Sequence, residues 1–246
     1  MISREEYAQW VEWAKNNYTN IPGILVSNYD AWECRAMLGR YLYVAKQYGA
    51  AILILETIVD VKYDEGEGDD QYNPTGLEMK AWSLQWMSLA ILFEKNDKVL
   101  ALKYMKKALR LADLSTAYFH FVVRGELWLN CLLLKAKLGR KIQAVGETHA
   151  RLSRLVVEDG LSNSYYFFGY AFLGQMAMEE QKPQLALDLF KKGLTAYNLE
   201  ETDKELLIQT EACADPGDAF KMLWQLVDEP YRLWDEPLNW EGSEET

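Results

Sequence analysis

The sequence has few of the side chains from which metal sites are built. Its 246 residues include only two histidines and three cysteines. A metal site usually draws on several His or Cys side chains or on clustered carboxylates, so we expect no metal centre. His120, within YFHFVV, is interpreted as a packed or hydrogen-bonded side chain. The cysteines lie far apart and predict reduced, structural thiols in a cytoplasmic protein: Cys34, Cys131 and Cys213.

The sequence motifs of common enzyme classes are also missing. The chain has no Gly-x-Ser-x-Gly, no P-loop and no dinucleotide-binding fingerprint. Gly66 and Gly68, in DEGEGDD, have no lysine and no adjoining strand, which argues against a phosphate-binding loop. The acids of this segment could bind calcium, but the ordered acids and closing glutamate of an EF-hand are missing. We expect a solvated acidic loop over 64–76, which could equally dock a basic partner. We expect no cofactor and no enzymatic activity.

Neither an export signal nor a membrane span is expected. The chain opens with MISREEYAQW, which brings charged residues at once and has no apolar signal core. Residues 160–178 carry no charge, but they include polar residues and glycines. They also barely reach the roughly 20 residues that a bilayer requires. We interpret this segment as the first helix of a packed helix pair.

What the sequence does contain is helical periodicity with recognisable helix starts. Ser3 and Glu6 form a capping box, and the apolar residues that follow predict an N-terminal helix over 3–18. Pro183 and Pro216 suit the first turn of two later helices, of which the second is expected to run to about Val227. No segment alternates as a strand does. The predicted fold class is therefore all-α.

A recurring pattern predicts stacked helix pairs. The segment FLGQMAMEEQKPQLALDLFKKGL places Gly174 in one helix and Ala186, Phe190 and Gly193 in the next. The small residues would let the two helices approach closely, and Phe190 would fill the space between them. The small residue that opens the second helix recurs upstream at Ala51, Ala101 and Ala144. The successive spacings are 50, 43 and 42 residues, and a period of this size is typical of helical repeats.

The segment 172–194 resembles a tetratricopeptide repeat, with helices longer than those of the usual repeat of about 34 residues. The resemblance implies an α-solenoid, a right-handed superhelix of antiparallel helix pairs. It would have an N-terminal capping helix and a C-terminal helical cap. The repeat region would span 1–199, followed by an acidic cap and tail over 200–246. The repeats would lie at about 30–63, 76–112, 115–157 and 163–198.

Members of this family usually bind peptides on the concave face, which the first helix of each pair forms. Some of them hold a peptide C-terminus with Lys and Asn side chains, but the matching places here are apolar or small, which argues against that mode. The resemblance predicts a groove lined by Arg40, Tyr43, Trp86 and Phe93. The alternative is that Trp86 and Phe93 belong to the core between repeats.

Charge is distributed unevenly along the chain. The net charge is −11, all of it in residues 200–246, whereas residues 103–154 hold eleven bases and three acids. Basic side chains recur there at helical spacing. They predict a basic stripe on the convex surface, made of Lys103, Lys106, Lys107, Arg110, Arg151 and Arg154. Such a stripe can bind polyanions; a solvated face, or a contact with the acidic end of the chain, is the competing interpretation.

Together these patterns predict a non-catalytic, cytoplasmic scaffold that binds a peptide segment or a protein partner. A second copy of the chain is one candidate for that partner. The alternative is a polyanion or nucleic-acid binder that uses the basic stripe. The acidity of the chain makes nucleic acid the less expected partner, and no membrane contact is expected. An enzyme with a carboxylate site in its helical interior is a third alternative, for which no residues stand out.

Overall fold

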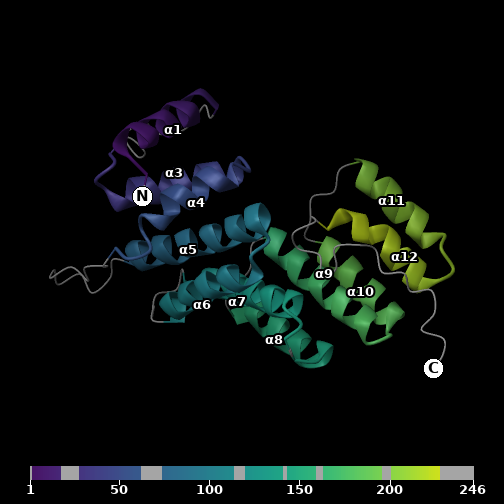
Figure 1. Ribbon diagram of the computed structural model, residues 1–246. Coiled ribbons are helices and arrows are strands. Elements are labelled where there is room, and N and C mark those ends of the chain that lie inside the picture. The colour runs from purple at the N-terminus through teal and green to yellow at the C-terminus, as the bar shows by residue number, and fades with distance from the viewer. Residues whose placement is uncertain are drawn as a thin grey trace. The chain divides into compact units, whose positions relative to one another are not determined.

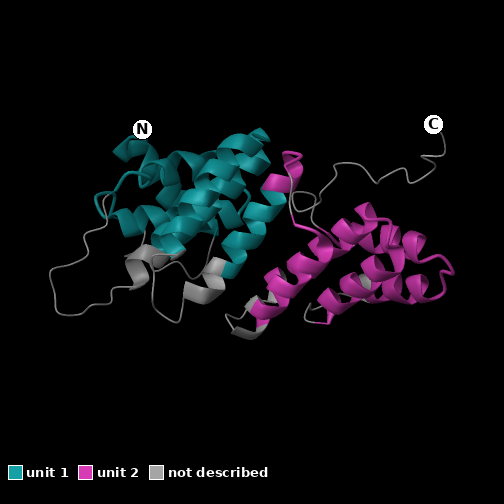
Figure 2. Ribbon diagram, turned by 90° about the horizontal axis from the view of Figure 1, so that it is seen from below, with its two compact units in different colours: residues 1–134 teal, residues 135–246 magenta. Residues whose placement is uncertain are grey.

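The computed structural model describes residues 2–17, 28–61, 74–113, 120–140, 143–158, 163–195 and 201–227 (Figure 1). Every regular element in these ranges is a helix, which confirms the prediction of an all-α protein. Most of the predicted acidic loop and the predicted tail after residue 227 lie outside the described residues. The chain divides into two compact units, Met1–Leu134 and Lys135–Thr246 (Figure 2). Each unit is described by itself.

Unit 1 begins with α1, Arg4–Asn17, which starts at the predicted capping box. The backbone N–H of Glu6 donates to Ser3 Oγ at 3.1 Å, and the backbone N–H of Ser3 donates to the Glu6 carboxylate at 2.8 Å. These bonds satisfy N–H groups that the start of a helix leaves unpaired. The buried face of α1 includes Tyr7 and Ala14, and the helix contacts α3.

Four further helices of unit 1 form two consecutive pairs: α3, Trp32–Val44; α4, Tyr48–Glu56; α5, Pro74–Lys95; and α6, Lys98–Asp113. Helix α3 packs on α4, and α5 packs on α6. Helix α5 also contacts both helices of the first pair. Gly39 of α3 allows a close approach to α4, because a Cβ at this position would overlap the Leu55 side chain. Ser88 of α5 donates its hydroxyl to the Ala101 carbonyl of α6 at 2.6 Å.

The boundary between the units falls within α7, His120–Lys137. Leu127, Leu129 and Leu133 of this helix are fully buried. Gly139 follows its C-terminal end with a φ of +64°, in the left-handed region that glycine adopts without steric cost.

In its described residues, unit 2 has five α-helices after α7: α8, Val145–Glu158; α9, Asn163–Glu179; α10, Pro183–Leu194; α11, Glu201–Glu211; and α12, Pro216–Leu223. Helices α9 and α10 form the predicted tight pair. A Cβ on Gly174 would lie 3.0 Å from the Ala186 carbonyl oxygen, and a Cβ on Gly193 would lie 2.9 Å from Tyr170 Cβ. Phe190 is fully buried between the helices. The close approach and the packing of Phe190 are therefore confirmed.

The C-terminal part of unit 2 packs on this pair through α12. Helix α12 contacts α10, and Phe220 meets Phe190 edge-on with ring centroids 5.5 Å apart. Asp215 caps α12 by accepting the backbone N–H of Asp218 at 2.9 Å. The helix is shorter than predicted: it ends at Leu223, and a 3-10 turn, Trp224–Leu226, follows. Helix α11, which contacts α12, was not predicted as a separate element.

Candidate functional site

The residues predicted to line a groove come together in pairs across α3 and α5 of unit 1. Arg40 of α3 and Trp86 of α5 form a cation–π pair, with the guanidinium carbon 5.6 Å from the centroid of the indole. Trp82, one turn earlier on α5, is stacked on Trp86 with centroids 6.2 Å apart and ring planes at 26°. The contact between α3 and α5 places these side chains next to each other.

The other two predicted residues meet further along the same two helices. Tyr43 of α3 is stacked on Phe93 of α5, with centroids 6.2 Å apart and planes at 22°. Tyr48, the first residue of α4, lies 5.8 Å from Tyr43 and 5.0 Å from Phe93 between centroids. Ring pairs of this kind contribute about 0.5–1.5 kcal/mol each beyond their buried area. The three rings therefore hold α3, α4 and α5 together at this end.

Sequence reasoning did not find two members of this surface. Trp82 stands four residues before Trp86, and this helical spacing was a signal that could have indicated it. Tyr48 comes from the second helix of its pair, so a search along the first helices could not reach it.

We call these six residues the aromatic row: Arg40, Tyr43, Tyr48, Trp82, Trp86 and Phe93. The five rings are half-buried and Arg40 is exposed. Among the described residues, no carboxylate forms an ion pair with Arg40. Val44, next to Tyr43 in the chain, is an exposed apolar side chain (59%). The row thus offers ring surface and one cation to the solvent.

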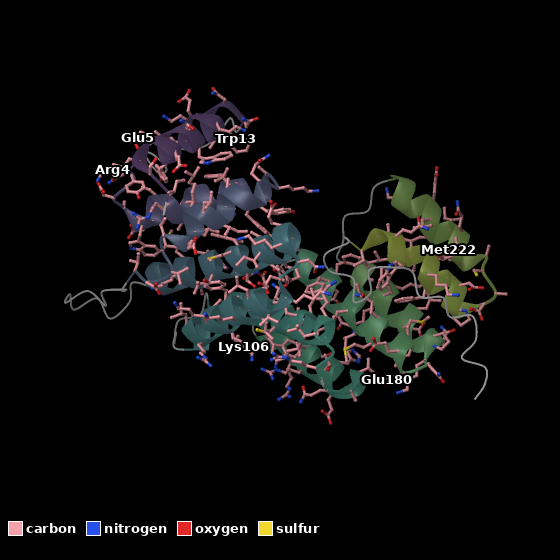
Figure 3. All side chains as sticks on the ribbon, viewed as in Figure 1. Arg4, Glu5, Trp13, Lys106, Glu180 and Met222 are labelled. Atoms are coloured by element: carbon pink, nitrogen blue, oxygen red, sulfur yellow. The ribbon has the colours of Figure 1, made fainter. Side chains whose placement is uncertain are left out.

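The basic residues predicted on α6 differ in their surroundings. Lys103 and Arg110 are exposed, whereas Lys106, labelled in Figure 3, is half-buried. Lys107 is half-buried too, and its ammonium donates to the Val59 carbonyl at 3.0 Å. The same ammonium lies 3.6 Å from a carboxylate oxygen of the exposed Asp60.

A second lysine binds the segment that follows α4. The ammonium of Lys80, a residue only 9% exposed, donates to the Val61 carbonyl. Burial, together with the charge of Lys107, lowers the pKa of Lys80. Both lysines therefore bind carbonyl groups beyond the C-terminal end of α4, as cations near helix ends commonly do. This contact gives Lys107 a structural role in unit 1.

The remaining two residues of the predicted stripe lie in unit 2. Arg151 and Arg154 are exposed on α8. The basic residues of α6 and those of α8 belong to different units, so the structure describes two basic faces, each by itself.

Other predicted features can be placed only in part. The described residues include no cluster of three or more His, Cys, Asp or Glu side chains that could hold a metal ion. No helix in the described ranges is both long enough and apolar enough to cross a bilayer. The uncharged segment 160–178 provides most of α9, and its residues from 167 on are buried, which confirms its interpretation as a packed helix. The side chain of His120 lies outside the described residues.

Comparisons with protein-family models, with curated proteins and with solved structures gave no significant match.

Proposed function

We propose that the chain is a non-catalytic helical scaffold that binds a peptide segment of a protein partner through the aromatic row. One observation carries this proposal. Six side chains from three helices form two contacting groups of three, and they leave half-buried rings and an exposed Arg40 at the surface. Aromatic side chains and arginine are the residues that contribute most often to the energetic centres of protein interfaces.

We further propose that the helix pairs form an α-solenoid similar to tetratricopeptide repeats, in the right-handed sense that this family adopts. The contact between α3 and α5, the first helices of two successive pairs, supports this proposal. The close approaches at Gly39 and Gly193 support it as well. In such a stack the first helices line one face. Four residues of the aromatic row were predicted for that face: Arg40, Tyr43, Trp86 and Phe93.

The chemistry of the row favours an extended, acidic partner segment. The guanidinium of Arg40 presents donors in a planar fork that matches a carboxylate. Stacking on Trp86 orients this fork, and the nearby rings offer flat apolar surface. Extended proline-containing segments dock on surfaces of this kind. The proposed ligand therefore carries Asp or Glu beside proline or aromatic residues.

Selection from a library of displayed random peptides on the immobilised full-length chain tests this proposal. We expect the selected peptides to share an acidic residue flanked by apolar ones. The double variant Arg40→Glu, Trp86→Ala should weaken their binding at least about tenfold, which corresponds to about 1.4 kcal/mol. The matched control is Arg110→Glu, which makes the same charge change at an exposed arginine of α6.

Equal binding of the selected peptides to the double variant and to the unmodified protein would remove the aromatic row from the proposal. Selection of basic peptides would contradict the part assigned to Arg40. Tight retention of the protein on heparin at low salt, and its loss after a modest increase in salt concentration, would instead favour the polyanion alternative. Binding to phosphate or sulfate groups depends steeply on the salt concentration.

A further inference from the structure

A second cluster of polar side chains lies in unit 2, where α9 begins and α10 ends. Its members come from three helices and the residue after the third: His149, Tyr166, Tyr170, Lys192 and Thr195. Helix α8 contacts α9, and α9 contacts α10. The approach of α10 to α9 at Gly193 brings the neighbouring Lys192 onto Tyr170.

Tyr170, only 2% exposed, is the centre of this cluster. The Lys192 ammonium lies 4.8 Å from the centroid of its ring, and Tyr170 is the main cause that raises the pKa of Lys192. The His149 ring meets Tyr170 edge-on, with centroids 5.9 Å apart and planes at 76°. The centroid of the Tyr166 ring lies 4.8 Å from that of Tyr170, with the planes at 49°.

None of the polar groups of the cluster is a carboxylate, and the Thr195 hydroxyl is already used, since it donates to the Lys192 carbonyl at 2.7 Å. The Lys192 ammonium has three N–H donors. Within the described part of the chain no carboxylate forms an ion pair with Lys192, which is exposed. Nε2 of His149 is buried and has no hydrogen-bond partner among the described residues. Buried polar atoms are nearly always hydrogen-bonded, so the described residues leave Nε2 of His149 without the partner that such an atom normally has.

We propose that this cluster binds a phosphate-type oxyanion, with Lys192 as its counter-charge. Lys192 and His149 come from separate helices, α10 and α8, so they would contact different oxygens of one bound ligand. A tetrahedral oxyanion has acceptor oxygens in three dimensions, whereas a carboxylate has two in one plane. Tyr166 lies in the first turn of α9, where the helix dipole also favours an anion.

His149 responds to the anion. Burial, and then the charge of Lys192, lower the pKa of His149 below its ordinary value, so the imidazole is neutral at neutral pH. In the tautomer that carries its proton on Nε2, this N–H donates to the anion. A bound negative charge favours the protonated imidazole, so binding raises the pKa of His149.

NMR spectroscopy of the histidine side chains tests this proposal, because the chain has only two. The variant His120→Gln leaves His149 as the single signal. Titration of the full-length protein with sodium phosphate should shift this signal saturably and raise its pKa. Sodium chloride and sodium acetate at matched ionic strength should do neither. A second titration with O-phosphoserine, with serine as control, distinguishes free phosphate from a phosphate ester as the preferred ligand.

Lys192→Met should abolish the phosphate-dependent shift, while Lys192→Arg, which keeps the charge, should retain it. Lys191→Met, one residue earlier on α10, is the matched control and should bind phosphate as the unmodified protein does. The proposal is overturned by a His149 signal that does not respond to phosphate, or that responds equally to chloride. It is also overturned if Lys192→Met remains folded and binds phosphate unchanged. These outcomes do not depend on the aromatic row of unit 1.

Discussion

Some aromatic residues of this chain are fully buried and others are half-buried at the surface. The first contribute to the stability of the fold, and we propose that the second contribute to binding. Phe190 is fully buried between α9 and α10, whereas Trp86 is half-buried and stacks on Trp82 and Arg40. Helical spacing indicated that Trp86 and Phe93 share one face of α5. It could not show whether another helix covers that face, because burial depends on contacts between segments distant in sequence.

Replacing these two rings should separate packing from surface binding. Phe190→Ala should cost about 3–5 kcal/mol in the free energy of unfolding, as expected for a fully buried ring. Trp86→Ala should cost less than half of that, because the indole is only partly buried in the folded state. Denaturant titration of both variants measures the two losses. If Trp86→Ala cost as much as Phe190→Ala, Trp86 would be a core residue and its assignment to a binding surface would be wrong.

The second residue-scale prediction concerns the pH dependence of stability. The pKa of His149 is lower in the folded than in the unfolded chain, where it is about 6.5. The unfolded state therefore binds more protons in this range, and the free energy of unfolding decreases as the pH falls below about 6.5. His149→Phe, which keeps a ring against Tyr170, should flatten this decrease. Urea unfolding between about pH 7.5 and pH 5 measures the effect.

His120→Gln provides the comparison for this experiment, because it removes the other histidine. A decrease in stability that is unchanged in His149→Phe would show that other groups cause it.

At the scale of helices, glycine positions control how closely neighbouring elements approach. A Cβ on Gly193 would come within 3.1 Å of the Phe167 carbonyl oxygen as well as meeting Tyr170, whereas a Cβ on Gly146 of α8 would meet nothing within 4 Å. We expect Gly193→Ala to destabilise the protein by about 1–3 kcal/mol, since α10 must move away from α9. Gly146→Ala should instead stabilise it, by up to about 1 kcal/mol.

The thermal midpoints of these two variants provide the measurement. A Gly193→Ala variant as stable as the unmodified protein would show that the two helices can separate at little cost. The same variant would also be expected to bind phosphate less well, because Lys192 follows the backbone of α10.

Local chemistry explains why the start of α1, the start of α12 and the α9–α10 pair could be predicted. A capping box, an Asp-Pro start and paired small residues all act within a few residues of chain. Helix α11, ETDKELLIQTE, was missed because it has no continuous apolar stripe, and its Ile208 is 67% exposed. The cluster around Tyr170 could not be predicted either, since it requires three helices to meet.

At the scale of the whole molecule, the dominant feature is its charge. Residues 229–246 hold six acids and one base, so their removal changes the net charge from −11 to −6. We expect this truncation to raise the salt concentration at which the protein elutes from heparin, because it weakens repulsion of a polyanion. Elution in a salt gradient provides the measurement.

A truncated protein that also carries Lys103→Glu and Arg110→Glu tests whether the exposed face of α6 is responsible. It should elute earlier than the truncation alone. Identical elution of the full-length and truncated proteins would show that the acidic end has no influence on the basic faces.

The packing of α12 sets a condition for any chimaera built from this protein. The Phe220 ring lies where a side chain on residue 174 would project, 2.9 Å from the Cβ that Gly174 does not have. A different helical hairpin could pack against α12 only if it had glycine at the position equivalent to Gly174. It would also need an aromatic ring, equivalent to that of Phe190, in contact with Phe220. Hairpins that carry alanine or a larger residue there would leave Phe220 in water. The compatibility of a donor hairpin could therefore be judged from two positions before any chimaera is made.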